Sequence, residues 1–467
     1  MNKIISKLKG FKTTEDNQIT YSQLFAFFIP LGTSTLLISI SNMLLNRALG
    51  YIPNAEFYIS SFNVARTLEL LFMSPVSVIA LVVTTFTVNI KTFKKVTKFA
   101  VINIVLLEIW FAIMSFTPIG RFFLGNIYNL DGELLDNAVL SLKIISFLPI
   151  CFLVRNYFLG VAIKLRNTKF ATLGSLLRVI MTFMLSISMP SIIKAVPPEY
   201  IGGILLTSII TLEALVYALG VIYTTRGKIL IQMILSLKRQ DTFSEETTTD
   251  YKKLIIFALP LILSYSMAQL LPSFSQSALA LSQNKEITLT IYAVSLSFIN
   301  VVGAFNFQIP QLVVNHDTFN PKNKNIVRNF CLIIAGIMLL CMIIIAFTGT
   351  GRYLAVSLLK LSPQNAELAK MSYVYGLFYP TSLVFMSYKR GKLIKIQKTA
   401  LLVFERVIGT LISLVLFIII PLISWEHGAG MGILVLTVAN FATGIFVDII
   451  FKVSVKKNPG LISHTLL

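Results

Sequence analysis

Residues Leu24–Gly50 read LFAFFIPLGTSTLLISISNMLLNRALG, an apolar stretch longer than the roughly 20 residues that cross a bilayer as a helix. A second stretch, Leu254–Ala280, reads LIIFALPLILSYSMAQLLPSFSQSALA and aligns with the first when Pro30 is placed on Pro260. Each stretch carries polar residues on one helical face: Ser39, Asn42 and Asn46 in the first, and Gln269, Ser273 and Gln276 in the second. Because a polar face inside a membrane must contact protein or water, we expect both helices to border a shared polar cavity.

The repeat extends over the whole chain and predicts two homologous halves. Arg178-Val-Ile-x-Thr182 matches Arg406-Val-Ile-x-Thr410, and further matches follow in the same order. We count about twelve apolar helices, six in each half, with a break expected near Pro75. The halves are residues 1–225 and 253–467, and residues 226–252 form a linker between them. Each half has an even number of helices, so both halves share one orientation and the site should lie between them.

Composition gives the same fold class. The chain of 467 residues is 55% hydrophobic and 13% charged, and its mean hydropathy is +0.80. Apolar runs of this length and number are typical of polytopic membrane proteins. The sequence therefore predicts an all-α polytopic membrane protein with about 12 transmembrane helices in two six-helix lobes around a central cavity.

The formal charge of +20 is explained by topology rather than by nucleic-acid binding. Lysine and arginine gather in alternate loops, around residues 91–98, 164–169, 322–328 and 389–398. The positive-inside rule then predicts that both termini lie in the cytoplasm. We expect a multi-pass protein of the cell (plasma) membrane. Met1–Thr20 is polar and charged, so we expect the first membrane helix to act as the insertion signal. We expect the lipid bilayer as partner, no nucleic acid, and a monomer, since each lobe supplies its own half of the interface.

Motifs for catalysis and for cofactors are missing from the sequence. The three cysteines and three histidines lack metal-ligand spacing, and no phosphate-binding loop occurs. No nucleophile stands near a base, so we expect neither an enzyme nor a cofactor. Transport driven by a gradient, or facilitated exchange, remains. A membrane scaffold without transport is the alternative from another class, and it predicts that all intramembrane charges are mutually paired.

Charged residues inside apolar helices mark the candidate site. Each costs about 2.5–3.5 kcal/mol at the bilayer centre and needs a partner or a cavity. Arg66 and Glu69 are three residues apart and can pair locally. Arginine keeps its charge and binds phosphate or carboxylate in a bidentate manner, so several arginines around one cavity favour an anion. The predicted substrate-binding residues are Asn46, Arg47, Arg66, Arg155, Arg178, Gln276 and Arg406. The other interpretation pairs Arg178 and Arg406 with Glu108 and Glu405, or has them tie helices together.

Several of these segments resemble the progressive ankylosis (ANKH) family. The segments are Phe28–Gly32 with Leu45–Ala48, Lys164–Arg178, Asp317–Lys324, and Lys398–Val415 with Pro421 and His427–Ala429. The chain lacks the long acidic tail of animal members and so resembles a compact, prokaryotic one. That family belongs with the multidrug, oligosaccharidyl-lipid and polysaccharide exporters.

The resemblance implies a two-lobed transporter with a V-shaped cavity that alternates between the two sides. It also implies export of small multivalent anions such as pyrophosphate, citrate or nucleotides. Asn46, Arg47, Arg178 and Arg406 match basic or polar positions of the family. Met386 stands where the family has a basic residue, and Arg155 holds the mirrored position in the other half. A flippase for lipid-linked oligosaccharides, of the same superfamily, remains the alternative because its substrates carry a pyrophosphate.

Overall fold

The computed structural model describes residues 19–87, 90–164, 169–223, 251–282, 284–316, 321–358, 360–395, 400–419 and 428–457. Within these ranges the chain is helical and contains no strand. A helix satisfies its backbone hydrogen bonds internally, which an apolar segment in lipid requires. The fold class predicted from the sequence is confirmed.

The first lobe contains α2 to α10. Its elements are α2 (Tyr21–Leu49), α3 (Ala55–Phe72), α4 (Ser74–Phe86), α5 (Ile90–Phe116), α6 (Pro118–Phe122), η1 (Phe123–Ile127), α7 (Gly132–Ile145), α8 (Leu148–Lys164), α9 (Lys169–Ala195) and α10 (Pro198–Tyr223). Large apolar side chains on α5 and α9, such as Leu106 and Met184, are more than 60% exposed, as lipid-facing residues are.

The second lobe repeats this order. Its elements are α12 (Tyr251–Leu279), α13 (Lys285–Val302), η2 (Ala304–Gln308), α14 (Ile309–His316), α15 (Pro321–Phe347), α16 (Gly349–Tyr353), η3 (Leu354–Leu358), α17 (Pro363–Tyr375), α18 (Tyr379–Lys395), α19 (Ala400–Ile419) and α20 (Gly428–Lys457). Within the described residues, each of the twelve predicted segments overlaps one of these helices or a broken series of them; the end of the eleventh, residues 420–423, lies outside these residues. Residues 226–250 of the predicted linker lie outside the described residues.

Several membrane segments are broken. The α3–α4 pair bends by 44° just before Pro75, as predicted, and the α7–α8 pair bends by 42° just before Pro149. A proline cannot donate the backbone hydrogen bond that would continue the preceding helix. The eighth segment, predicted as one helix, is divided at Gly303 into α13, η2 and α14. Among the described residues, seven helices are long and apolar enough to span a membrane alone, and three bent pairs also qualify.

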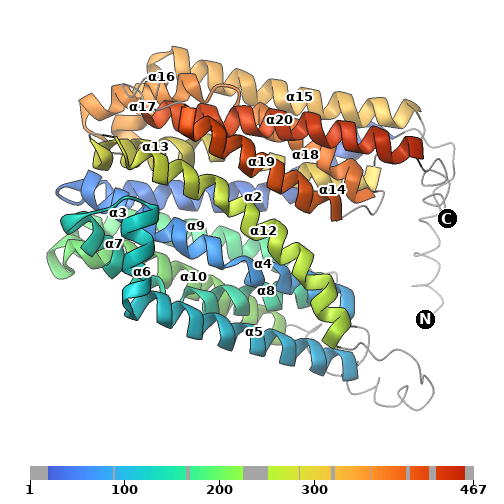
Figure 1. Ribbon diagram of the computed structural model, residues 1–467, viewed down its shortest axis with the longest axis horizontal. Coiled ribbons are helices and arrows are strands. Elements are labelled where there is room, and N and C mark those ends of the chain that lie inside the picture. The colour runs from blue at the N-terminus through green and yellow to red at the C-terminus, as the bar shows by residue number, and fades with distance from the viewer. Residues whose placement is uncertain are drawn as a thin grey trace.

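We call the end where α5, α9 and α15 begin the Lys/Arg-rich end. At this end the first helix of each lobe packs against the other lobe. There α2 packs on the second lobe, and Phe28 lies 5.5 Å from Phe330, between ring centroids. Reciprocally, α12 crosses toward α4 and α5 (Figure 1), where Phe257 lies 5.1 Å from Phe86. This reciprocal packing places one helix of each lobe along the boundary between them.

The lobes also touch at the opposite end. Thr290 of α13 donates a hydrogen bond of 2.7 Å to the Glu56 carbonyl oxygen, and Asn365 of α17 donates one of 2.7 Å to the Glu56 carboxylate. Asn129 donates to the Ser277 carbonyl oxygen at 3.3 Å. A single apolar cluster joins both lobes at this end. The space between the lobes is therefore bounded by contacts at both ends.

Candidate functional site

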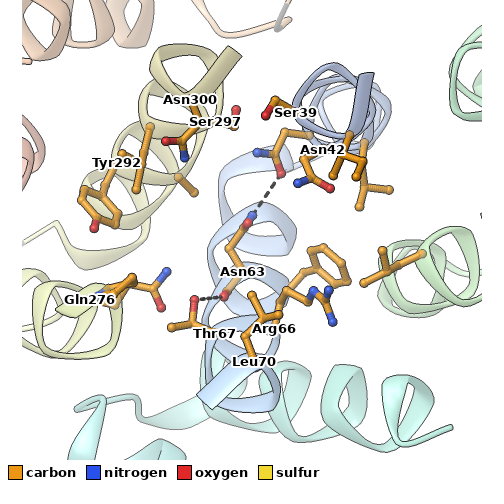
Figure 2. A pocket seen from close by; sticks show the side chains of 18 of the residues that line it. Ser39, Asn42, Asn63, Arg66, Thr67, Leu70, Gln276, Tyr292, Ser297 and Asn300 are labelled. Carbon is orange, nitrogen blue, oxygen red and sulfur yellow. Dashed lines mark hydrogen bonds between the residues drawn. The ribbon is translucent and has the colours of Figure 1, made fainter. Parts of the chain in front are cut away.

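A cavity of about 460 Å³ lies between the lobes, lined by residues of α2, α3, α8, α9, α10, α12, α13 and η2. Its volume is in the range of small-molecule sites. The polar face predicted for α2 borders it: Ser39, Asn42 and Asn46 all line the cavity. Figure 2 shows Ser39 and Asn42 on this wall. Asn63 of α3 donates to the Asn46 side-chain oxygen at 3.2 Å, which joins the two helices at the cavity wall. From α12, Gln276 lines the cavity.

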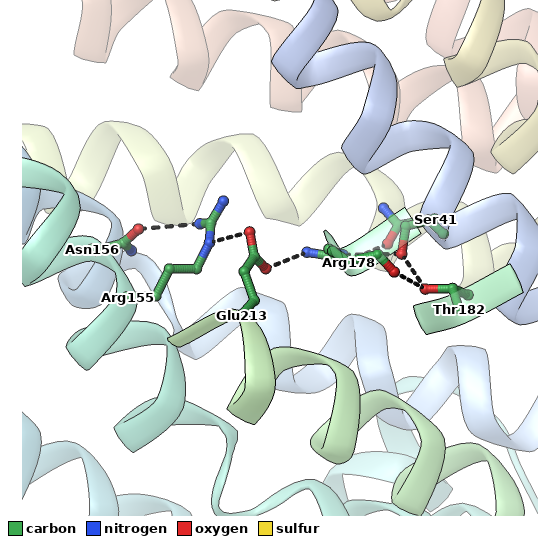
Figure 3. Close-up of polar contacts among 7 residues, drawn as sticks. Ser41, Arg155, Asn156, Arg178, Thr182 and Glu213 are labelled. Carbon is green, nitrogen blue, oxygen red and sulfur yellow. Dashed lines mark hydrogen bonds and ion pairs between the residues drawn. The ribbon is translucent and has the colours of Figure 1, made fainter. Parts of the chain in front are cut away.

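Arg155 of α8 and Arg178 of α9 share one buried carboxylate. Glu213 of α10 is 0% exposed, and its oxygens lie 2.8 Å from Arg155 Nε and 3.3 Å from Arg178 Nη1 (Figure 3). Arg178 also donates to the Ser41 hydroxyl at 3.0 Å and to the Asn42 side-chain oxygen at 2.8 Å. The guanidinium of Arg178 is thus held against α2, where it lines the cavity.

These partners differ from the pairing weighed from the sequence. Glu108 does not bind Arg178; its carboxylate accepts the Ile150 backbone N–H at 3.0 Å. Glu405 pairs with Arg390 of α18 rather than with Arg406. The pairing of Arg178 and Arg406 with these two carboxylates is therefore wrong.

Arg66 and Glu69 form the local pair that their spacing predicts. Arg66 is 16% exposed and lines the cavity, while the Glu69 side chain behind it is 0% exposed. The Arg66 guanidinium also lies 5.3 Å from the centroid of the Phe152 ring, another cavity residue. An arginine over an aromatic face in a desolvated place gains further electrostatic stabilisation.

The charges around the cavity are unequal. On the first-lobe wall, three arginines (Arg66, Arg155, Arg178) face two carboxylates (Glu69, Glu213), which leaves one positive charge. The second-lobe wall contributes neutral hydrogen-bonding groups: Gln276, Tyr292, Ser297 and Asn300. A net positive charge in a partly dehydrated cavity attracts an anion, and guanidinium groups bind carboxylate or phosphate strongly.

Two predicted site residues lie elsewhere. Arg47 is outside the cavity lining; it donates to the Tyr51 hydroxyl at 3.3 Å, and Lys360 of the other lobe lies 5.4 Å from the centroid of the same ring. Arg406 of α19 is also outside the lining and makes no ion pair with any described residue. The structure thus brings together five of the seven predicted residues: Asn46, Arg66, Arg155, Arg178 and Gln276.

Sequence reasoning missed polar residues of α3 and α13. Asn63 and Thr67 flank Arg66 on one face of α3, and Ser297 and Asn300 lie three residues apart on α13. Their helical spacing is the signal that would have found them. Among the described residues, no group of three histidine, cysteine or acidic side chains could hold a metal ion.

No protein-family profile matches the chain, and no curated protein is similar to it. Its fold, however, is similar to that of solved MATE and other MOP superfamily transporters. A multidrug resistance MATE family transporter in an outward-facing conformation has a TM-score of 0.60 and 14% identity, over 95% of this chain and 99% of its own. An inward-facing MATE family transporter has a TM-score of 0.58 and 13% identity, over 91% and 98%. A MOP superfamily transporter from Pyrococcus furiosus, described as having a binding pocket of reverse polarity, has a TM-score of 0.55 and 14% identity, over 96% and 99%.

Proposed function

We propose that this protein is a multi-pass membrane transporter that exports small anions by alternating access of its two lobes. The observation that carries the proposal is the surplus positive charge of the cavity wall formed by Arg66, Arg155 and Arg178. The fold supports transport, because proteins of this fold are described in inward- and outward-facing conformations. The resemblance to the ANKH family makes pyrophosphate, citrate or a nucleotide the first substrates to test.

In the proposed binding mode, the first lobe contributes guanidinium groups and the second lobe contributes neutral hydrogen-bonding groups. Arg66 supplies the most accessible guanidinium, and Arg178, held by α2 through Ser41 and Asn42, supplies a second. Gln276 and Asn300 on the second lobe donate or accept hydrogen bonds with the neutral part of the substrate. An anion that contacts both walls draws the lobes together, which couples binding to the change of access.

Alternating access requires that the contacts at the two ends break in turn. The exchange of α2 and α12 closes the Lys/Arg-rich end, and the contacts of Glu56 close the opposite end. In this proposal, the Lys/Arg-rich end faces the cytoplasm, both termini lie there, and a single chain of the plasma membrane completes the transporter without an enzymatic step or a cofactor.

The test is thermal stabilisation of the purified protein by pyrophosphate, citrate, ATP and a lipid-pyrophosphate head-group mimic. A ligand at one hundred times its dissociation constant stabilises the folded state by about 2.7 kcal/mol. The variant carries Arg66→Gln together with Glu69→Gln, so that no buried carboxylate loses its partner. Its matched control carries Arg121→Gln with Asp136→Asn, an exposed ion pair outside the cavity.

We expect one soluble anion to stabilise the wild type and the control, and stabilisation to be lost in the cavity variant. A response confined to the lipid-pyrophosphate mimic would instead favour the flippase. If no anion stabilises the wild type, anion export is wrong.

A further inference from the structure

Glu69 differs from the other cavity carboxylate in one respect. Among the described residues, Glu213 forms ion pairs with two arginines, Arg155 and Arg178, whereas Glu69 forms one with Arg66 alone. Oε1 of each carboxylate is buried and makes no hydrogen bond with a described residue, but Glu213 Oε1 lies 2.8 Å from the charged Arg155 Nε. A buried carboxylate oxygen without a donor can accept a proton without breaking an existing contact.

Within the part of the chain that the structure describes, Glu69 pairs with Arg66 alone, and Arg66 is the cavity arginine most accessible to a substrate. The Arg66 side chain is 16% exposed and lines the cavity, compared with 12% for Arg155 and 4% for Arg178. An anion that binds Arg66 therefore competes with Glu69 for the same positive charge. A buried carboxylate that loses its counter-ion is strongly disfavoured in the charged form.

The net charge that remains in the cavity differs between a bound monoanion and a bound dianion. The cavity wall carries one net positive charge, so a bound monoanion is neutralised as it stands. A bound dianion leaves one uncompensated negative charge in a partly dehydrated site. One proton on Glu69 restores neutrality, because the wall then carries two positive charges.

We propose that Glu69 is a proton-binding site linked to the substrate cavity, so that the protein binds a dianion together with one proton. The proton moves from cavity water to Glu69. The Arg66 guanidinium keeps its own proton and forms an ion pair with the anion. The transported unit is then a dianion plus a proton. This inference rests on the proposed function, because it needs an anion in the cavity.

Other titratable groups near α3 are already paired, neutral or outside the cavity. The helices packed against α3 carry the following ones: Tyr21 and Arg47 on α2, Glu133, Asp136 and Lys143 on α7, Glu199, Tyr200, Glu213, Tyr217 and Tyr223 on α10, Tyr251, Lys252, Lys253 and Tyr265 on α12, and Lys285, Glu286 and Tyr292 on α13. Among the described residues, only Arg66 makes an ion pair or hydrogen bond with Glu69. Glu213 is paired with Arg155 and Arg178.

The test measures binding of methanedisulfonate, a dianion at every working pH, by calorimetry between pH 6 and 8. Methanesulfonate, a monoanion of fixed charge, is the matched ligand. Repeating the titration in buffers of different ionisation enthalpy counts the protons taken up on binding. We expect uptake of about one proton per dianion and a dissociation constant that rises up to about tenfold per pH unit.

Two variants locate the proton. Glu69→Gln imitates the protonated carboxylate, so its affinity for the dianion should match that of the wild type at low pH and stay constant as the pH rises. Glu108→Gln, an intramembrane carboxylate outside the cavity, should keep the wild-type pH dependence. The number of protons taken up on dianion binding is measured on the wild type. This measurement tests the coupling of proton and dianion binding even if Glu69→Gln does not fold.

The outcomes separate the inference from the proposed function. Dianion binding without proton uptake overturns the inference and leaves anion transport standing. An unchanged pH dependence in Glu69→Gln assigns the proton to another group and also overturns it. Absence of binding by every anion tested removes the proposed function, and the inference with it.

Discussion

Replacing Glu213 by glutamine tests the shared counter-ion of the cavity. The change keeps the shape of the side chain but removes the charge that Arg155 and Arg178 share at 2.8 and 3.3 Å. Both arginines are then left with no carboxylate within ion-pair distance in the described part of the chain, and Arg178 is only 4% exposed. Breaking a buried pair by removing one partner costs about 3–5 kcal/mol, because the remaining charge cannot be hydrated.

We therefore expect Glu213→Gln to lower the free energy of unfolding by about 3–5 kcal/mol. This corresponds to a change of roughly two to three and a half orders of magnitude in the unfolding equilibrium. The loss should shrink when sulfate is added, since Arg155 and Arg178 line the cavity and a bound anion can replace the missing carboxylate. The residual hydrogen bonds of Arg178 to Ser41 and Asn42 should keep α9 against α2.

The assay is reversible unfolding in mixed micelles of detergent and dodecyl sulfate, followed by circular dichroism with and without sodium sulfate. The matched control is Glu405→Gln, another carboxylate that is 0% exposed, whose partner Arg390 is outside the cavity lining. We expect a similar loss in this control but no recovery with sulfate. A loss below about 1 kcal/mol in Glu213→Gln, or equal recovery of both variants, would refute the reasoning.

Two further predictions concern close approaches of helices. In Gly174→Ala, the new Cβ would lie 2.3 Å from a ring carbon of Tyr217, so we expect a loss of about 1–3 kcal/mol in the same unfolding assay. Gly336→Ala, where a Cβ meets nothing within 4 Å, should be neutral or stabilising by up to about 1 kcal/mol. In Gly32→Ala, a Cβ would lie 2.1 Å from the Phe305 ring and should separate α2 from η2. Ser297→Cys should then react faster with an impermeant thiol reagent from the Lys/Arg-rich end when Gly32→Ala is present than when it is absent. An unchanged labelling rate would contradict this.

Features that depend on one helix could be predicted from the sequence. The polar face of α2 follows from the spacing of Ser39, Asn42 and Asn46, and the structure places all three at the cavity. The Arg66–Glu69 pair follows from a separation of three residues on one helix, and the structure contains it. Each requires only the helical period and the cost of burying polar groups in an apolar environment.

Features that join different helices could not be predicted in this way. Glu213 of α10 meets Arg155 of α8 and Arg178 of α9, and no spacing in the sequence relates these residues. The repeat aligns Arg406 with Arg178, but Arg406 has no ion pair among the described residues, while its neighbour Glu405 pairs with Arg390. The two halves share their pattern, yet their charged contacts differ.

The sequence by itself determined the membrane class, the approximate helices, the two-lobed repeat and the polar face of α2. These depend on apolar length and on residue spacing along one helix, which act locally. Only the tertiary structure decided that α2 and α12 pack against the opposite lobes and that Glu213 is the counter-ion of two arginines. The tertiary structure also placed Arg47 and Arg406 outside the cavity. The rotation and depth of each packed helix set these distances, and both arise from the packing of many side chains together.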